Sequence, residues 1–272
     1  MMRLTYDPGL VEEAVLIAER TMPNAEAAAF RRERNCGYDI ADPDRREAAF
    51  ETLHLRWFRR RGLHAMVEQV VAACKGVSDR LDEGRVLKAV ARREEGADLV
   101  DQIAPGAPGA IAERPILVVR LRPGTLVEPE ALRTLLCHEL MHVADMLDPA
   151  FGYQRSLPRS DDGPSGDNLV RDRYRVLWDV TIDGRRARAE RSRQEGRLER
   201  DQADPTRHAR WQEFAATFSM LGDAGRSVFE EWFDHVHPTH ARVAEVARAP
   251  RGSGTAGRQT GRCPLCRFPT AA

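Results

Sequence analysis

Residues 135–148 read LLCHELMHVADMLD, with His138 and His142 four positions apart and Glu139 directly after the first histidine. On an α-helix, residues i and i+4 lie on one face, so both imidazoles point the same way and can bind one metal ion. Glu139 lies one step around the helix, where its carboxylate can reach a water molecule beside the ion without being a ligand. The stretch therefore predicts a zinc-binding helix with a general base next to the metal.

The sequence on either side predicts where this helix begins and ends. Pro129 is typical of a first helical turn, and Asp148-Pro149 is a stop signal, so we expect a helix from about 128 to 147. Leucine, methionine and valine occupy several sides of it, which indicates burial. Imidazoles and a carboxylate buried there would be costly without a metal ion.

Composition restricts the class of protein. The chain of 272 residues is long enough for one large domain or one and a half, and its formal net charge of zero argues against a partner held through nucleic-acid phosphates. Five cysteines, an odd number, make a disulfide framework improbable. No run approaches the roughly eighteen apolar residues of a membrane helix, and no signal peptide is visible. We therefore expect a cytoplasmic protein that binds neither nucleic acid nor membrane; its oligomeric state is not readable.

The remaining chain predicts an α+β fold. Two short β-branched runs, 85–91 and 114–121, are typical of strands. Helical periodicity and caps predict helices over 8–34, 43–60, 62–75, 169–194, 207–221 and 226–235, with a loop over 152–168. We expect a small antiparallel or mixed sheet, the helix that carries the histidines, and additional N-terminal helices.

The histidine-bearing helix resembles a known family. LLCHELMHVAD is similar to the active-site helix of the zincin metallopeptidases, and HELMHVADMLD to the HExxHxxDxxD pattern of the Mlc titration factor peptidases. In zincins an antiparallel edge strand beside this helix holds the peptide substrate, and RPILVVRL (114–121) is placed as that strand would be. The resemblance implies a zincin-like catalytic domain over 77–248, after an N-terminal helical region (1–76) and before a linker and tail (249–272).

The family also implies a third zinc ligand, for which four carboxylates compete. Asp179 and Asp183 are four apart in LWDVTIDGR (177–185). Asp183 lies five residues after Trp178, where some minimal bacterial zinc peptidases have their ligand aspartate, so we expect it as the ligand and Asp179 as a brace for a histidine. A thermolysin-like order would reverse these roles. The alternatives are Glu213, in a segment similar to one of the titration-factor peptidases, and Asp148, at the place of a metzincin ligand.

A second zinc site is predicted in the tail. Cys263-Pro-Leu-Cys266 has the spacing of a structural zinc knuckle but supplies only two ligands. His237 and His240 can supply two more across a glycine-containing linker, which gives a His2Cys2 site. The alternatives are a pair of cysteines without metal and a site completed by another protein.

The resemblance implies a zinc-dependent endopeptidase or aminopeptidase acting on a protein or peptide, with Glu139 as general base. Tyr153 and Tyr174 are candidates for the group that stabilises the oxyanion. The alternative is a non-catalytic zincin-like module that binds zinc for partner binding or regulation. A purely structural zinc site has no need of Glu139, which favours the enzyme.

Overall fold

The computed structural model describes residues 2–101, 115–160, 162–194, 205–235 and 237–248. Internal contacts divide the chain into two compact units, residues 1–154 (unit 1) and 155–272 (unit 2). Helices occur in both units and a four-stranded mixed sheet lies in unit 1, which confirms the α+β class. The domain bounds expected at residues 76 and 248 stay a prediction.

The sheet of unit 1 has the order β1-β2-β4-β3. Its strands are β1 (Arg3–Tyr6), β2 (Glu83–Lys88), β3 (Gly96–Val100) and β4 (Ile116–Leu121). β1 and β4 run parallel to β2, whereas β3 runs antiparallel to β4 and forms an edge. The first four residues of β4 are all buried, as expected for an internal strand. The expectation that residues 114–121 form the edge strand is therefore wrong, and β3 has that position instead.

The helices of unit 1 match the sequence best where local signals are strong. They are α1 (Pro8–Glu19), α2 (Asn24–Tyr38), α3 (Pro43–Arg60), α4 (Ala65–Ala73), α5 (Lys75–Ser78), α6 (Pro123–Leu126) and α7 (Pro129–Leu147). The Asp42 side chain caps α3, accepting a hydrogen bond from Arg45 N at 2.8 Å. The helix expected over 8–34 is two helices, because Pro23 is the N-cap of α2 and cannot continue α1.

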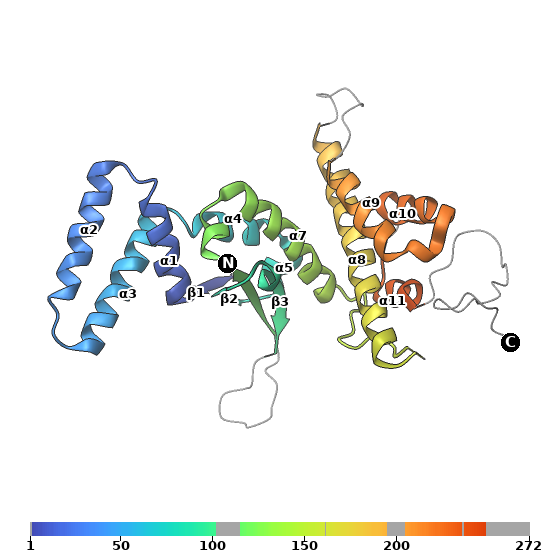
Figure 1. Ribbon diagram of the computed structural model, residues 1–272, viewed down its shortest axis with the longest axis horizontal. Helices are drawn as coiled ribbons and strands as arrows, with labels where there is room; N and C mark the ends of the chain where they lie inside the picture. The colour runs from blue at the N-terminus through green and yellow to red at the C-terminus, as the bar shows by residue number, and fades with distance from the viewer. Residues whose placement is uncertain (1, 102–114, 161, 195–204, 236, 249–272) are drawn as a thin grey trace, which may run out of the picture. The chain divides into compact units, whose positions relative to one another are not determined.

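The core of unit 1 fixes the position of α7. Leu132, Leu136, Leu140 and Val143 are buried at helical spacing in the hydrophobic core. α7 packs against β3, α4 and α5 (Figure 1). α1 packs against α3 and α6 in the same unit.

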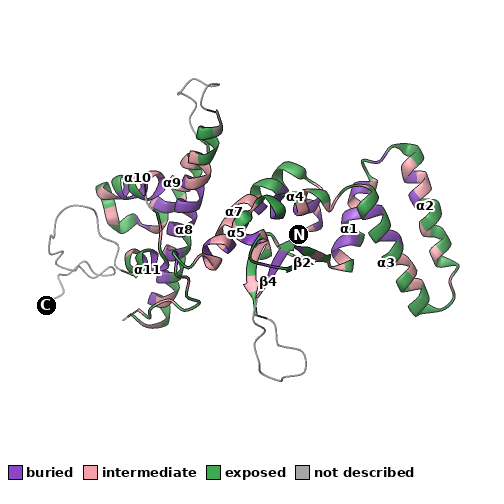
Figure 2. Ribbon diagram, turned by 180° about the vertical axis from the view of Figure 1, so that it is seen from behind, coloured by how far each residue is buried: buried purple, intermediate pink, exposed green. Residues whose placement is uncertain are grey.

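Unit 2 is built around one long helix. α8 (Gly163–Gln194) packs against α9 (Pro205–Thr217), α10 (Gly225–Asp234) and α11 (His240–Arg248), and a 3-10 helix, η2 (Ser219–Ala224), precedes α10. Buried residues gather in the middle of α8, where 176–183 are all buried (Figure 2). α8 begins inside the segment expected as a loop, and α11 was not expected.

One glycine allows α8 and α10 to approach closely. A Cβ atom built on Gly184 would lie 1.9 Å from the carbonyl oxygen of Phe233 in α10. Arg188, one turn further along α8, donates a hydrogen bond to the same oxygen. A side chain larger than that of glycine at position 184 therefore requires the two helix backbones to move apart.

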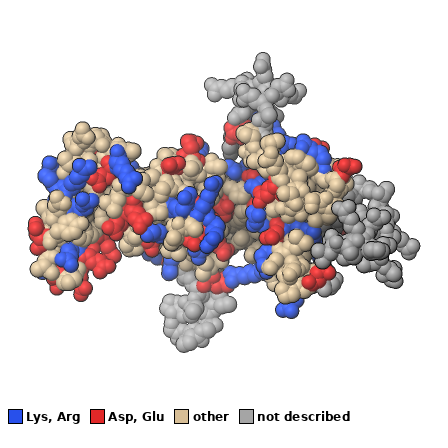
Figure 3. Space-filling view, in the orientation of Figure 1, with Lys and Arg blue, Asp and Glu red and all other residues tan. Residues whose placement is uncertain are grey.

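The surface carries both signs of charge. Acidic and basic side chains are interspersed over the described residues on the face in Figure 3, in keeping with the equal numbers of the two kinds, 42 each. Among the described residues, no helix combines the length and the apolar character that crossing a membrane requires.

Candidate metal centre

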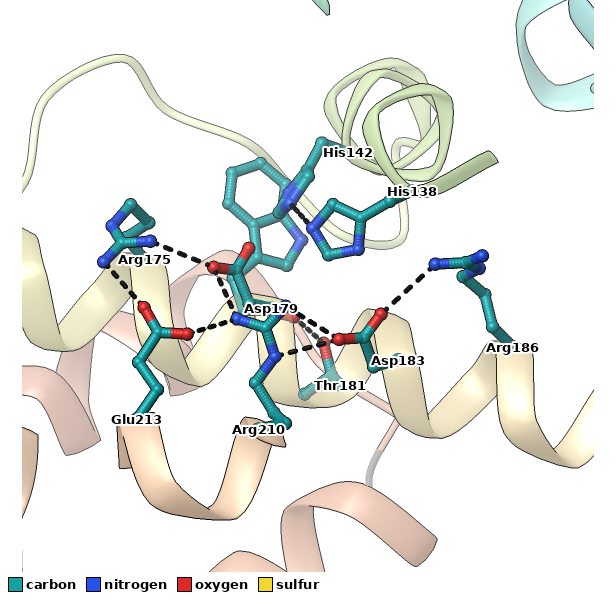
Figure 4. A network of polar contacts seen from close by, with 10 residues as sticks. His138, His142, Arg175, Asp179, Thr181, Asp183, Arg186, Arg210 and Glu213 are labelled. Atoms are coloured by element: carbon teal, nitrogen blue, oxygen red, sulfur yellow. Dashed lines mark hydrogen bonds and ion pairs between the residues drawn. The ribbon is translucent and has the colours of Figure 1, made fainter. Parts of the chain in front are cut away.

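The two histidines of α7 form a pair with the spacing of metal ligands. The Nε2 atoms of His138 and His142 are 3.3 Å apart, and the ring planes are inclined by 73° (Figure 4). Two nitrogens that ligate one tetrahedral zinc ion at about 2.0–2.1 Å lie about 3.3–3.4 Å from each other. The pair, which lies wholly within unit 1, therefore fits two ligand positions on a single ion.

The packing of α7 explains why these rings are available. Leu136 and Leu140 bury one face of the helix in the core, and each lies two positions from His138, on the far side of the helix. His138 and His142 are only half-buried as a result. Burial of α7 on several sides was expected from the sequence; the structure buries the apolar stripe and Asp145, and leaves the two histidines of the opposite face partly accessible.

Glu139 is held by the edge strand of the sheet. The backbone N–H of Ala97 in β3 donates a hydrogen bond to Glu139 Oε2 at 3.3 Å. A Cβ atom on Gly96 would lie 3.0 Å from the same oxygen, so glycine at this position lets the carboxylate lie against the strand. The general base predicted from the sequence is therefore fixed relative to an edge strand that the sequence analysis did not find.

An ion pair between the buried carboxylate of Glu95 and the partly exposed side chain of Arg122 secures the start of β3. Glu95 Oε1 accepts a hydrogen bond from Arg122 N at 3.0 Å, and Oε2 accepts one from Arg122 Nε at 2.8 Å. Burial raises the pKa of Glu95, but hydrogen bonds from Arg122 and Thr125 lower it, and the net direction is downward. The pair joins the residue before β3 to the start of α6. No motif in the sequence pointed to Glu95 or Ala97.

The carboxylates considered as third ligands are mostly in unit 2. Asp179 and Asp183 are buried on α8, and both contact Arg210 of α9 (Figure 4). Glu213, also on α9, pairs with Arg210 and with Arg175 of α8. We call this set the carboxylate–arginine network; its members are Asp179, Asp183, Glu213, Arg175, Arg186 and Arg210.

Asp148 has a different environment. It is the C-cap residue of α7 in unit 1, and its Oδ1 accepts a hydrogen bond from Ala150 N at 3.0 Å. This bond stabilises the turn that follows the helix. The side chain therefore has a local structural role.

The predicted tail site is described only in part. His237 is exposed, and His240 is buried with its Nδ1 2.8 Å from the hydroxyl oxygen of Tyr174. Burial lowers the pKa of His240. Cys263 and Cys266 lie outside the described residues, so the His2Cys2 site stays a prediction. The contact with His240 gives Tyr174 a structural partner in unit 2.

Comparisons with known proteins give no match. The chain matches no model of a known protein family, no curated protein and no solved structure.

Proposed function

We propose that this chain is a zinc-dependent peptidase with a zincin-like core, in which His138 and His142 hold the ion and, as the sequence predicts, an aspartate of α8 is the third ligand. The observation that carries the proposal is the 3.3 Å separation of the two Nε2 atoms on α7, which suits two ligands of one tetrahedral ion. Two imidazoles and one carboxylate are a donor set that zinc accepts, and three protein ligands leave one position open for water or substrate.

The contacts within unit 2 favour Asp179 over Asp183 as the third ligand. Asp183 meets arginines through both oxygens: Oδ1 is 3.4 Å from Arg186, and Oδ2 accepts a hydrogen bond from Arg210 Nε at 2.8 Å. Asp179 Oδ2 contacts Arg210 at 3.2 Å and Arg175 at 3.3 Å, and both contacts are longer than that bond. A ligand oxygen that binds the ion must weaken its contacts with arginine. Asp183 would lose the shorter, stronger contact, so binding the ion costs it more free energy than it costs Asp179. This assignment reverses the roles that the sequence analysis expected.

Glu139 would act as the general base. When bound, the ion would polarise a substrate carbonyl and acidify a water molecule. The hydrogen bond from Ala97 N holds Oε2 of Glu139, and we assign Oε1 to proton transfer. That oxygen would take a proton from the attacking water and deliver it to the departing amine.

The surroundings of Glu139 support a peptide as substrate. β3 is an antiparallel edge strand, and one of its backbone amides contacts the general base. An extended peptide can pair with an exposed strand edge through main-chain hydrogen bonds. A scissile bond bound in this way would lie close to Glu139.

The test compares Glu139→Gln with Glu130→Gln, a control at an exposed position in the first turn of the same helix. Zinc content and hydrolysis of a mixed library of fluorogenic peptides are measured for both and for the wild type. We expect wild type and control to bind zinc and cleave peptide. Glu139→Gln should retain zinc and lose about 10²- to 10⁴-fold in rate, the usual contribution of a general base.

Two results would count against the proposal in different ways. A wild-type chain that binds no zinc would refute the metal centre. A chain that binds zinc but cleaves no peptide, with Glu139→Gln indistinguishable from it, would favour the non-catalytic zinc-binding module. For the third ligand, Asp179→Ala should weaken zinc binding more than Asp183→Ala does; the opposite order would restore Asp183 as the ligand.

A further inference from the structure

We infer that Arg210 is a positioning residue that holds Asp179 in the arrangement the metal requires; this inference rests on the proposed function. Its guanidinium is the centre of the carboxylate–arginine network (Figure 4). Nη1 donates to Asp179 Oδ2 at 3.2 Å and to Glu213 Oε2 at 2.6 Å. Nε and Nη2 both contact Asp183 Oδ2, at 2.8 and 2.7 Å. One side chain thus joins three carboxylates.

The placement of the two aspartates creates the need for this cation. Asp179 and Asp183 are four apart on α8, so their carboxylates lie on one face of the helix, and both are buried. Two buried like charges repel each other, and each has lost hydration. A cation in contact with both carboxylates offsets this repulsion.

Burial distinguishes Arg210 from the other arginines of the network. The side chain of Arg210 is 16% exposed, whereas those of Arg175 and Arg186 are 59% and 29% exposed. Solvent screens an exposed ion pair and reduces its contribution. Arg210 is also the arginine that contacts both aspartates, since Arg175 binds Asp179 and Arg186 binds Asp183.

The planar shape of the guanidinium matters as much as its charge. Its donors have fixed directions, so the contact of Nε and Nη2 with Asp183 sets the direction in which Nη1 meets Asp179. Lysine offers a point charge on a flexible stem and fixes no such plane. Arg210 therefore restricts the orientation of the Asp179 carboxylate before any ion binds.

The test measures metal binding by the full chain, using zinc and cobalt(II) as probes. Arg210→Lys keeps the charge but not the planar donor group, and Arg210→Gln removes the charge. Arg186→Gln is the matched control, because Arg186 contacts Asp183 on the same helix. Zinc affinity is obtained by competition with a chromophoric chelator, and the visible absorption spectrum of the cobalt(II) form reports the geometry of the ligands.

We expect both Arg210 variants to bind zinc about 10- to 100-fold more weakly than the wild type, the usual loss for residues that orient a ligand. Their cobalt(II) bands should change in position or intensity, whereas Arg186→Gln should resemble the wild type in both measurements. A loss of stability alone would leave the cobalt(II) spectrum of the folded protein unchanged, and this result would overturn the inference. Wild-type zinc affinity in Arg210→Lys, or an equal loss in Arg186→Gln, would overturn it too.

These outcomes are distinct from failure of the proposed function. If the wild type binds neither zinc nor cobalt(II), the metal centre is wrong and the role of Arg210 is wrong with it. If the wild type binds both ions and the Arg210 variants are unaffected, the role of Arg210 alone is refuted.

Discussion

Gly184→Ala tests the close approach of α8 and α10, the contact that holds unit 2 together near Asp183. The added methyl carbon would lie 1.9 Å from the carbonyl oxygen of Phe233 and 2.7 Å from its carbonyl carbon. A carbon–oxygen contact without strain is about 3.3 Å or longer. The two Phe233 atoms belong to the helix backbone, and a Cβ atom has no rotamer of its own. No side-chain rotation can therefore relieve the clash, and the two helices must separate.

Two effects of opposite sign decide the magnitude. Alanine is favoured over glycine in a helix by about 1 kcal/mol. Overpacking a well-packed contact costs about 1–3 kcal/mol and occasionally more. Separation would also weaken the hydrogen bond that Arg188 donates to the carbonyl oxygen of Phe233. A hydrogen bond from a charged donor contributes about 1.5–3 kcal/mol. We expect the clash to dominate, with a net loss of about 3 kcal/mol in the free energy of unfolding.

Urea unfolding followed by tryptophan fluorescence measures this loss. Three of the four tryptophans, Trp178, Trp211 and Trp232, belong to unit 2, so the signal reports mainly on that unit. Gly225→Ala is the control in the same unit: its new Cβ would be 3.6 Å from the nearest atom, an ordinary contact. The control should leave the free energy of unfolding unchanged or raise it by up to about 1 kcal/mol. A Gly184→Ala protein as stable as the wild type, or more stable, would refute the close contact.

Two further predictions concern a buried histidine and the tail. Burial lowers the pKa of His54, so the unfolded chain takes up a proton more readily, and stability should fall as pH drops through about 6.5. His54→Leu should lack this part of the pH dependence in urea unfolding at pH 7.5 and 5.5; an identical slope would contradict the assignment. If His237, His240, Cys263 and Cys266 share an ion, truncation after Arg248 should lower the zinc content measured by atomic absorption from two per chain to one, and an unchanged content would exclude the tail site.

The parts of the fold that the sequence predicted well have local signals. α3 begins at Pro43 after the Asp42 cap, and α7 lies between Pro129 and the Asp148-Pro149 stop, so neighbouring residues define both helices. The strands β1 and β3 were missed. They are four and five residues long, too short for a periodic pattern, and their pairing partners lie elsewhere in the chain.

In the candidate site, too, the sequence predicts what depends on neighbouring residues and misses what depends on distant ones. The spacing of His138 and His142 predicts a shared metal because both residues lie on one helix. The same spacing cannot choose between Asp179 and Asp183, which share a face of α8. Arg210, whose contacts distinguish them, lies 27 residues after Asp183. The hydrogen bond that holds Glu139 comes from the backbone N–H of Ala97, 42 residues away.

The pairing of β1 with β2 has a consequence for the order in which the protein folds during synthesis. Arg3 pairs with Glu83, 80 residues later, so β1 leaves the ribosome long before its partner. At about 5–20 residues per second, the wait lasts several seconds. The helices α1–α3 need only nearby residues and can form in that interval. We therefore expect the strand that is synthesised first to join the sheet late, with half-buried Leu4 and Tyr6 exposed until then.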